Sequence, residues 1–288
     1  MKTLVTGANG FIGSRFLTHT TPSKDLFLHV RRQNAADALM QAGFQTLVGE
    51  DGLAKLPSVD TIVHFAGKPG GSWKDCMESN ILPTIEILRV MEKKQIPHLV
   101  FLSSGSVYGD TPNVIKEEES YNPTTAYGAS KVAGEIIISD WVGHKRIASA
   151  TVLRGNNIYG PGSDHGVVSL FLDRIRKNQQ IEIDGDGSQI REPVYVDDVI
   201  ELVNLVLANS PMGVVTYTLS GGEFFTLKSL IEHIPKALHV PAQFKVSGRP
   251  AQPPLSMRLD ISKAEKELGW RPHTVFSDGL AKIIEAHV

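Results

Sequence analysis

The sequence contains a single cysteine, Cys76, among its 288 residues, so no disulfide can form within the chain. A protein without a disulfide framework suits a reducing compartment, and we expect it in the cytoplasm. No apolar run reaches the roughly 18 residues that a membrane-spanning helix requires, so we expect no membrane association. The apolar start Thr3–Thr6 is cut short by Gly7, which argues against a signal peptide.

The sequence also lacks an excess of either charge, because 29 Lys and Arg residues nearly balance 31 Asp and Glu residues, which gives a formal net charge of −2. So small a net charge gives no broad positive field, which disfavours nucleic-acid binding. The motifs His-Glu-x-x-His, Cys-x-x-Cys and Gly-x-Ser-x-Gly are absent from the sequence. We therefore expect neither a metal site nor a hydrolase built on a nucleophile elbow.

Apolar residues are plentiful at 41%, enough for the core of one large or two modest domains. In the first half, short runs rich in β-branched and aromatic residues show little polar alternation, as in strands buried on both faces of a parallel sheet. The predicted strands are Thr3–Thr6, Leu26–Val30, Thr61–Phe65, Leu99–Ser103 and Ala150–Leu153.

Amphipathic segments lie between these strands. The predicted helices are Phe11–Thr18, Ala35–Gln41, Trp73–Lys93 and Thr125–Asp140. Pro83 is expected to kink or divide the third helix, because proline lacks the amide hydrogen that a helix interior needs. The alternation of strand and helix predicts an α/β fold with a Rossmann-type doubly wound parallel sheet.

The second half predicts helices joined by loops rich in Gly and Pro. These helices are Val167–Lys177, Asp197–Ala208, Leu227–Ile234, Ser262–Leu268 and Ser277–Ala286. Neither an internal repeat nor a long linker separates the two halves. We expect residues 1–160 to form a first, dinucleotide-binding domain. Residues 161–288 should form mainly a smaller C-terminal substrate-binding lobe, with the Asp197–Ala208 region crossing back to the first domain.

A glycine-rich turn follows the first predicted strand. It reads Gly7-Ala8-Asn9-Gly10-Phe11-Ile12-Gly13, and a helix is expected to begin near Phe11. Glycines three residues apart permit a tight turn and a close approach of the backbone to a pyrophosphate, which a helix N-terminus attracts. Since the spacing is not G-x-G-x-x-G, the turn is a variant of the dinucleotide-binding fingerprint. A purely structural turn is the alternative.

The end of the second predicted strand bears on the cofactor. An acid there bonds the ribose 2′-hydroxyl of NAD, whereas arginine accommodates the 2′-phosphate of NADP. Here Arg31 and Arg32 follow Leu26–Val30, and the next acid along the chain is Asp37. Guanidinium groups pair well with phosphate. The sequence therefore predicts NADP(H) as the preferred cofactor and NAD(H) as the second choice, the alternative being an exposed basic turn.

Tyr127 and Lys131 are four residues apart, which places both on one face of a helix. A nearby ammonium stabilises phenolate, so the pair can exchange a proton with an alcohol or a carbonyl. Upstream, the segment Phe101–Gly109, which contains Ser103 and Ser104, leaves a buried strand and enters a polar turn at the edge of the sheet where ligands bind in such folds. A hydroxyl there can polarise the oxygen that Tyr127 serves. A half-buried tyrosine beside a surface lysine is the alternative.

Seven motifs in order resemble the extended short-chain dehydrogenase/reductase family, the NAD(P)-dependent epimerases and dehydratases of nucleotide sugars. The resemblance covers almost the whole chain. Its motifs are Thr6–Gly13, Asp60–Gly67, Ser103–Gly109, Tyr127–Lys131, Leu153–Gly162, Gly185–Val199 and Asp260–Pro272. It implies a general acid/base role for Tyr127, with Lys131 as its partner that also reaches the nicotinamide ribose. It also implies that Ser104 bonds the reacting oxygen.

The resemblance extends these roles to further residues. Cofactor contacts are implied for Phe65, Ala66, Gly67 and Ser103, beside the glycine-rich turn and the catalytic pair. Ser106 becomes a possible helper to Ser104, and Asn157 a contact to the nucleotide-sugar phosphates or nearby groups. Arg191 and Arg249 stand at positions often used against a diphosphate or a nucleoside. Salt bridges at the surface or between packed lobes are the alternative for both arginines.

Departures from the family pattern limit what the resemblance implies. Dehydratases carry Asp-Glu after the Ser/Thr, where this chain has Gly105-Ser106, so dehydration is disfavoured. Pro83 replaces a glycine in the motif that begins at Asn80, and Pro193 stands where an aromatic residue is usual. The segment Lys68–Asp75 is short and rich in glycine beside the expected substrate mouth. These departures leave the sugar and the nucleotide open.

Three readings of the function follow. The first is an NADP(H)-preferring oxidoreductase or epimerase that transfers hydride at a sugar carbon of a nucleotide sugar, and a homodimer is the assembly considered for it. The second is an NADPH-dependent reductase of a non-sugar carbonyl, because the segment His29-Val30-Arg31-Arg32 is similar to a reductase branch acting on flavonoid-like ketones. The third is a non-catalytic NADP-binding sensor, which the intact Ser-Tyr-Lys set argues against. His64 is expected to be a core histidine and His165 an exposed loop histidine.

Overall fold

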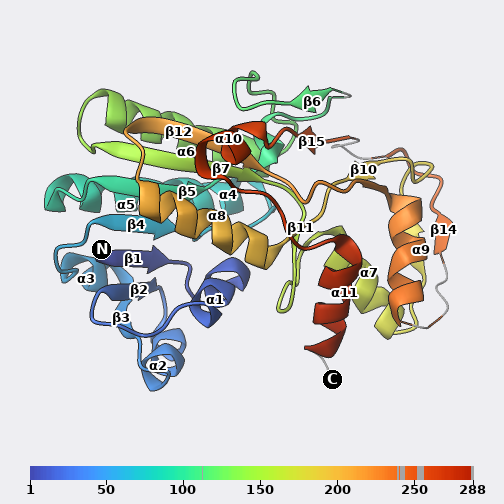
Figure 1. The fold of residues 1–288 in the computed structure, drawn as a ribbon, viewed down its shortest axis with the longest axis horizontal. Helices are drawn as coiled ribbons and strands as arrows, with labels where there is room; N and C mark the ends of the chain where they lie inside the picture. The colour runs from blue at the N-terminus through green and yellow to red at the C-terminus, as the bar shows by residue number, and fades with distance from the viewer. Residues whose placement is uncertain (112, 239, 241–243, 252–255, 287–288) are drawn as a thin grey trace. The chain divides into compact units, whose positions relative to one another are not determined.

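The computed structural model describes residues 1–111, 113–238, 240, 244–251 and 256–286 (Figure 1). Two units are distinguished by their internal contacts, and both take segments from either side of residue 160. Unit 1 comprises Met1–Ser103, Ala129–Leu153 and Leu202–Tyr217, whereas unit 2 comprises Ser104–Gly128, Arg154–Glu201 and the chain from Thr218 onward.

The central element is a seven-stranded sheet of order β12-β7-β5-β4-β1-β2-β3. Its strands are β1 (Thr3–Thr6), β2 (Leu26–Val30), β3 (Gln45–Val48), β4 (Thr61–His64), β5 (His98–Leu102), β7 (Ser149–Gly155) and β12 (Gly213–Leu219). All pairs from β7 to β3 are parallel. The chain runs outward from β1 through β2 to β3 and then returns to β4 on the other side. This order confirms the predicted doubly wound, Rossmann-type α/β fold and puts a switch point between β1 and β4.

Helices alternate with these strands, as predicted for all of them except α3. They are α1 (Phe11–Thr18), α2 (Gln33–Gln41), α3 (Gly49–Ala54), α4 (Trp73–Cys76), α5 (Leu82–Lys94), α6 (Ala126–Gly143) and α8 (Val196–Asn209). Strand residues such as Leu4, Ile62 and Leu99 pack in one core with apolar side chains of α3, α5 and α6. Every residue of β1, β4 and β5 is buried, which is why these strands lack polar alternation.

The predicted helix Trp73–Lys93 is divided, as expected from Pro83. It consists of α4, a π-helical segment η1 (Met77–Ile81) and α5, with Pro83 in the first turn of α5. Proline is tolerated there because the first amides of a helix have no partner within the helix. Asn80 lies in the π-helical segment, which is a feature often found at functional sites.

Three elements of the sheet and its flanks were not predicted. β3 begins with the exposed Gln45 and is not fully buried at any position, so it lacks the apolar run that identifies an inner strand. α3 holds only six residues, two of them glycines. β12 has the exposed Val214 among half-buried residues at its start and is fully buried only at Tyr217–Leu219. Edge and short elements of this kind carry weak periodic signals.

Unit 2 has small sheets packed with helices. Its pairs are β10–β13, β11–β8, β14–β9 and β15–β6. Its strands are β6 (Val114–Ile115), β8 (Ile158–Tyr159), β9 (Ile181–Ile183), β10 (Ile190–Arg191), β11 (Val194–Tyr195), β13 (Phe225–Thr226), β14 (Phe244–Val246) and β15 (Arg258–Leu259). Its helices are η2 (Gly105–Val107), α7 (Gly166–Arg176), α9 (Leu227–Leu238), α10 (Ser262–Leu268) and α11 (Phe276–Glu285).

The core of unit 2 joins α7, α9 and α11 around Tyr159, Phe171 and Ile231. Trp270 is fully buried, and its indole donates to the carbonyl of Asp198 at 2.9 Å. The Asp198 carboxylate accepts from the backbone amides of His273 and Thr274. A buried carboxylate with several donors is an anchor for the chain that follows Trp270.

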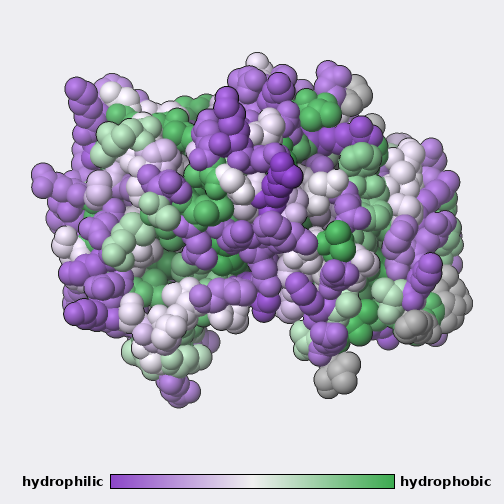
Figure 2. All heavy atoms as spheres, in the orientation of Figure 1, coloured by the Kyte–Doolittle hydropathy of each residue, from purple (hydrophilic) through white to green (hydrophobic). Residues whose placement is uncertain are grey.

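On the face drawn in Figure 2, hydrophilic and hydrophobic residues are interspersed. Among the described residues, no helix combines the length and hydropathy that crossing a membrane requires.

Candidate functional site

The glycine-rich turn is closed by a hydrogen bond from the Gly10 amide to the Gly7 carbonyl at 3.0 Å. Gly7 has φ +72°, and a Cβ there would lie 2.6 Å from the backbone nitrogen of Ala66. A Cβ on Gly13 would lie 2.1 Å from the Gly7 carbonyl oxygen. Both positions therefore require glycine, because the turn is packed against backbone on both sides. A Cβ on Gly10 would meet the same oxygen at 3.3 Å, which is a tight but smaller conflict.

Helix α1 starts directly from this turn. Its N-cap is Gly10, which supplies no side-chain hydrogen bond to the first amides. Asn9 and Gly10 are exposed, while Phe11 and Ile12 are half-buried. Backbone amides at an uncapped helix N-terminus, with the positive end of the helix dipole, suit an anionic group such as a pyrophosphate. The turn thus has the shape and the polarity that a dinucleotide needs.

The segment after β4 lies against the glycine-rich turn. Phe65 donates its amide to the Thr6 carbonyl at 3.2 Å, and Ala66 is the backbone that a side chain on Gly7 would strike. Gly67 follows and is exposed. These three predicted cofactor contacts therefore lie at the carboxyl end of β4, next to the turn that follows β1. This edge is where ligands bind in open α/β sheets.

Arg31 and Arg32 directly follow β2, and both are exposed. Arg32 is the N-cap of α2 in extended backbone and makes no side-chain cap bond. His29, two residues earlier, has its pKa lowered by burial, with a further lowering from the Arg31 charge. The two guanidinium groups thus stand at the strand end where the ribose of a bound dinucleotide is read in such folds.

Lys131 is buried on α6, and its Nζ donates to the Leu102 carbonyl at the end of β5, at 2.8 Å. The same ammonium lies 4.9 Å from the centre of the Phe101 ring. A Cβ built on Gly67 would lie 3.4 Å from it. Burial lowers the pKa of Lys131 to about 8, and the charge of Glu135 opposes that shift. The lysine is therefore held beside the predicted cofactor segment, where burial and the Glu135 charge act on its protonation in opposite directions.

Asn80 was not assigned a site role from the sequence, and the structure places it within the same unit next to these groups. Its Oδ1 accepts from the Lys68 amide at 2.7 Å, and its Nδ2 donates to the Ser130 hydroxyl at 2.9 Å. Asn80 therefore ties the chain after Gly67 to the residue before Lys131. The π-helical turn is the structural reason for its position, and no short sequence motif encodes such a turn by itself.

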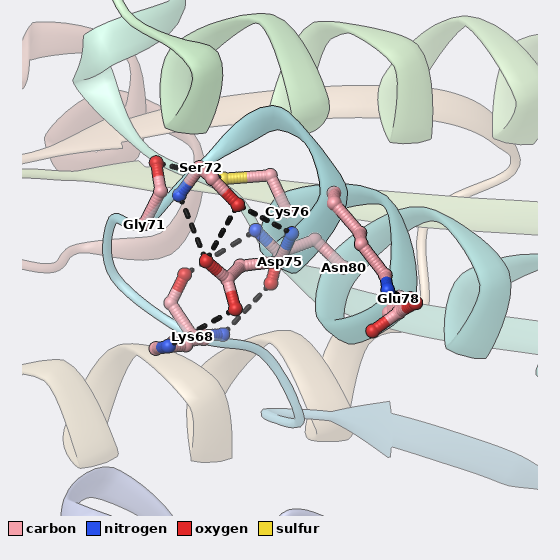
Figure 3. Close-up of polar contacts among 8 residues, drawn as sticks. Lys68, Gly71, Ser72, Asp75, Cys76, Glu78 and Asn80 are labelled. Carbon is pink, nitrogen blue, oxygen red and sulfur yellow. Dashed lines mark hydrogen bonds and ion pairs between the residues drawn. The ribbon is translucent and has the colours of Figure 1, made fainter.

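The segment Lys68–Asp75 closes on itself through Ser72 and Asp75 (Figure 3). The Ser72 amide and hydroxyl donate to the Asp75 carboxylate at 2.9 and 2.7 Å. In return, the Asp75 amide donates to the Ser72 hydroxyl. These bonds form a capping box at the start of α4 and lower the pKa of Asp75. Lys68 Nζ lies 3.6 Å from Asp75, and Trp73 is strongly exposed.

In unit 2, Ser104 caps the short helix η2. Its buried hydroxyl accepts from the Ser106 amide at 3.1 Å and donates to the Ser106 hydroxyl at 3.0 Å. A Cβ on Gly105 would lie 2.4 Å from the side-chain nitrogen of Asn156. Gly105 therefore permits Asn156, a residue that the sequence did not single out, to pack against this turn. The acidic pair of dehydratases has no counterpart in the turn.

Tyr127 lies half-buried in the first turn of α6, and Lys131 follows one turn later on the same helix. The predicted helical spacing of the pair is confirmed. The Thr125 hydroxyl accepts from the Gly128 amide at 3.0 Å. A Cβ on Gly128 would lie 2.5 Å from the Ser106 carbonyl oxygen, so the start of α6 packs against the Ser104–Ser106 turn. Ser104, Ser106 and Tyr127 consequently belong to one packed region of unit 2.

The three predicted substrate contacts beyond Ser106 differ in their surroundings. Asn157 adopts φ +49° between β7 and β8, and its carbonyl accepts from Val194. Arg191 is half-buried, donates to the Ile190 carbonyl at 2.8 Å and has its pKa lowered by burial. Arg249 is exposed and pairs with Asp184 at 2.8 Å and Glu182 at 3.6 Å. An ion pair thus engages Arg249 in this structure.

The sequence did not indicate the contacts of Arg154, which lies beside two tyrosines of unit 2. Arg154 is buried and donates to the Tyr108 hydroxyl, to the Glu117 carbonyl at 2.8 Å and to the Tyr121 hydroxyl at 3.1 Å. Its guanidinium lies over both tyrosine rings, at 4.9 and 5.2 Å. These contacts satisfy a buried charge and hold the segment after Ser104 in place.

His64 is a core histidine, as predicted. It is buried on β4, with Thr6 at 2.8 Å from Nδ1, and it stacks on Phe101. Burial and then the Lys131 charge lower its pKa to about 3, so it is neutral at physiological pH. His165 is exposed, also as predicted. Among the described residues, no group of three or more His, Cys, Asp or Glu side chains is arranged to hold a metal ion.

Comparison with known proteins adds evidence independent of this geometry. A sequence profile of the NAD dependent epimerase/dehydratase family matches residues 3–217. The UDP-glucose 4-epimerase of Mycolicibacterium smegmatis is 30% identical over 319 residues, covering 99% of this chain and 98% of its own. The dTDP-glucose 4,6-dehydratase of Streptomyces niveus is 29% identical over 316 residues, covering 99% and 92%.

A solved structure is similar to this chain along its whole length. A double mutant of DesIV, the dTDP-glucose 4,6-dehydratase of Streptomyces venezuelae, has a TM-score of 0.90 to this chain at 26% identity. The match covers 100% of this chain and 97% of that one, and the solved protein holds NAD and DAU.

Proposed function

The chain belongs to the NAD dependent epimerase/dehydratase family, enzymes of the extended short-chain dehydrogenase/reductase type, and on this premise we propose that it transfers hydride reversibly at a sugar carbon of a nucleotide sugar. The observation that carries the proposal is the buried ammonium of Lys131. It is held by the Leu102 carbonyl beside Gly67, one helical turn after Tyr127.

The residues present fit a nicotinamide dinucleotide. Side chains at Gly7 and Gly13 would fill the turn, and the uncapped start of α1 offers amides to a pyrophosphate. Asn9, Gly10, Phe11 and Ile12 complete that turn. When bound, the cofactor supplies or accepts the hydride. We assign the nicotinamide side to Phe65, Ala66, Gly67 and Ser103, with Lys131 donating to the ribose.

In the proposed mechanism, Tyr127 takes the proton of the sugar hydroxyl as the carbon is oxidised and returns a proton when the ketone is reduced. The Lys131 ammonium stabilises the phenolate form, which lets the phenol act near neutral pH. Ser104 holds the reacting oxygen through its hydroxyl, helped by Ser106. Because Gly105 and Ser106 supply no acid, we exclude elimination of water from the proposal and favour epimerisation or reduction.

A turnover assay with a panel of nucleotide sugars tests the proposal. Epimerisation would give the epimer with no net change in the cofactor, whereas reduction would consume one NADPH for each product formed. An NADPH-dependent reductase of a non-sugar carbonyl is the second candidate, favoured by Arg31 and Arg32 at the end of β2. Turnover of flavonoid-like ketones together with inactivity on every nucleotide sugar would select it.

Within this proposal, NADP(H) binds more tightly than NAD(H), although the solved relative described above holds NAD. The support is the pair of exposed guanidinium groups that follows β2, where an acid would repel a 2′-phosphate. We also assign cofactor binding to unit 1 and the main substrate contacts to unit 2. We also propose a cytoplasmic homodimer. The exposed apolar residues Met77 on η1, Leu82 on α5 and Ile136 on α6 would suit an interface.

Arg31→Asp is expected to weaken NADPH binding by about ten- to a hundredfold, the range for hydrogen bonds to a charged group, while NADH binding changes little. The dissociation constants of both cofactors, measured by fluorescence titration, give the result. Arg89→Asp makes the same charge change at an exposed site on α5 and serves as the control. Equal affinity of the wild type for the two cofactors would contradict the preference.

Arg191→Ala is expected to raise KM for the nucleotide sugar strongly and to leave NADPH binding unchanged. Arg191 is proposed to bind the diphosphate, which lies away from the reacting carbon, so most of this binding is equal in the ground and transition states. Asn157 and Arg249 carry the same assignment. Steady-state kinetics measure the effect, with Arg176→Ala on the exposed surface of α7 as the matched control. A KM unchanged from wild type would remove Arg191 from the site.

A further inference from the structure

Leu102, the last residue of β5, and Ser103, which follows it, bond two residues that lie one turn apart on α6. Lys131 donates to the Leu102 carbonyl, and the Ser103 hydroxyl donates to the carboxylate of Glu135. Gly134 lies between them, and a Cβ there would stand 3.0 Å from the Phe101 ring. The absence of a side chain at this position lets the helix approach the strand closely enough for both bonds.

Both side chains at this contact are buried, Glu135 to 2% and Lys131 to 6% relative exposure. A buried charge is costly unless a partner of opposite sign or hydrogen bonds compensate it. Glu135 and Lys131 are four residues apart, so they share one face of α6. Burial draws the pKa of Lys131 down to about 8, and the charge of Glu135 acts against that shift. The carboxylate therefore preserves the cationic form of the lysine.

Several neighbours of Lys131 supply no negative charge that would raise its pKa. His64 on β4 is neutral, because its pKa is about 3. Tyr127, one turn earlier on α6, is the group that Lys131 is proposed to serve. The β5 neighbours Phe101 and Leu102 are uncharged, as is Asn80 of η1. The charge of Glu135 is the influence that raises the pKa of Lys131 against the effect of burial.

We propose that Glu135 is a positioning residue that keeps Lys131 protonated and fixes α6 against the end of β5. This inference rests on the proposed function, in which the Lys131 ammonium serves Tyr127 and the cofactor ribose. It adds a residue that touches neither substrate nor cofactor. Glu135 acts on the reaction through the charge of Lys131 and, by bonding Ser103, through the strand end that leads to Ser104.

Glu135→Gln tests the charge at nearly constant shape. Removing the negative charge lowers the pKa of Lys131. NADPH affinity should therefore start to fall at a pH about one unit lower than in wild type, which is the lower end of the effect expected from a close opposite charge. The alkaline limb of kcat/KM should move in the same direction. Above that limb the variant should be about tenfold weaker than wild type. Near pH 6, where Lys131 is protonated in both proteins, the two should be nearly equal.

Two variants separate charge from packing. Glu135→Asp keeps the charge, and its alkaline limb should stay close to that of wild type. Glu86→Gln neutralises a half-buried acid on α5, and it should leave the limb unchanged. An unmoved limb in Glu135→Gln, or an equal loss at every pH, would overturn the proposal. If Glu135→Gln does not fold, Glu135→Asp tests the proposal instead. A shift of its alkaline limb by a full pH unit, although the charge is retained, would contradict the proposal.

The binding measurement also distinguishes this inference from the proposed function. If Tyr127→Phe keeps full turnover, the proposed mechanism fails. The pH dependence of NADPH affinity would still report whether Glu135 controls Lys131. If Tyr127→Phe is inactive and the Glu135→Gln limb does not move, the mechanism stands and the positioning role of Glu135 is wrong.

Discussion

Tyr127→Phe is expected to lower kcat on the nucleotide-sugar substrate by about 10²- to 10⁴-fold, the usual contribution of a general acid/base. The substitution removes the exchangeable proton and keeps the ring, so the half-buried side chain should pack as before. NADPH binding should survive, because the glycine-rich turn and Arg31 are unchanged. Steady-state kinetics together with a cofactor titration measure both parts of the expectation.

The pH profile provides a second measurement on the same variant. Wild-type kcat should show an ionisation well below the value of about 10 for free tyrosine, since the Lys131 ammonium favours phenolate. That ionisation should disappear in Tyr127→Phe. Tyr121→Phe is the matched control, because it removes a phenolic hydroxyl that bonds Arg154 and that the proposed mechanism does not use. Near-normal turnover of Tyr127→Phe would reject the mechanism and favour a nucleotide-binding sensor.

Gly13→Ala is expected to weaken cofactor binding by at least about tenfold and to destabilise the protein by about 1–3 kcal/mol, the usual cost of overpacking. The added methyl group would lie 2.1 Å from the Gly7 carbonyl oxygen and 2.8 Å from the Ala8 Cα. Both are backbone atoms, so α1 must move away from the turn. That movement displaces the amides proposed to hold the pyrophosphate. NADPH titration and thermal unfolding measure the two effects.

Gly10→Ala is the matched control from the same turn. Gly10 is exposed with φ −83°, and its added methyl group would meet the Gly7 oxygen at 3.3 Å. A small shift of the turn relieves that contact, so the loss of affinity should be clearly smaller than in Gly13→Ala. Equal affinities of the two variants would show that close packing of α1 on the turn does not determine cofactor binding.

Several features of the site lie beyond the reach of sequence periodicity. Asn80 acts through a π-helical turn, and an apolar pattern does not distinguish such a turn from an α-helix. Glu135 falls within the predicted helix Thr125–Asp140, but its burial depends on the position of Ser103. Asn156 packs against the Ser104–Ser106 turn only because Gly105 has no side chain, and this contact is not evident from the sequence. In each case the partner is distant in sequence, and only the folded chain brings the two together.

The sequence by itself determined the α/β class, the inner strands, the position of the glycine-rich turn and the spacing of Tyr127 and Lys131. These follow from local signals, because apolar runs, glycines and helical periodicity act over a few residues. The tertiary structure decided that Gly7 and Gly13 must be glycine, that Lys131 is buried beside Gly67, and that Arg249 pairs with Asp184 and Glu182. The reason is physical: burial, pKa and ion pairing depend on which distant segments exclude water from a group, and no local pattern specifies those segments.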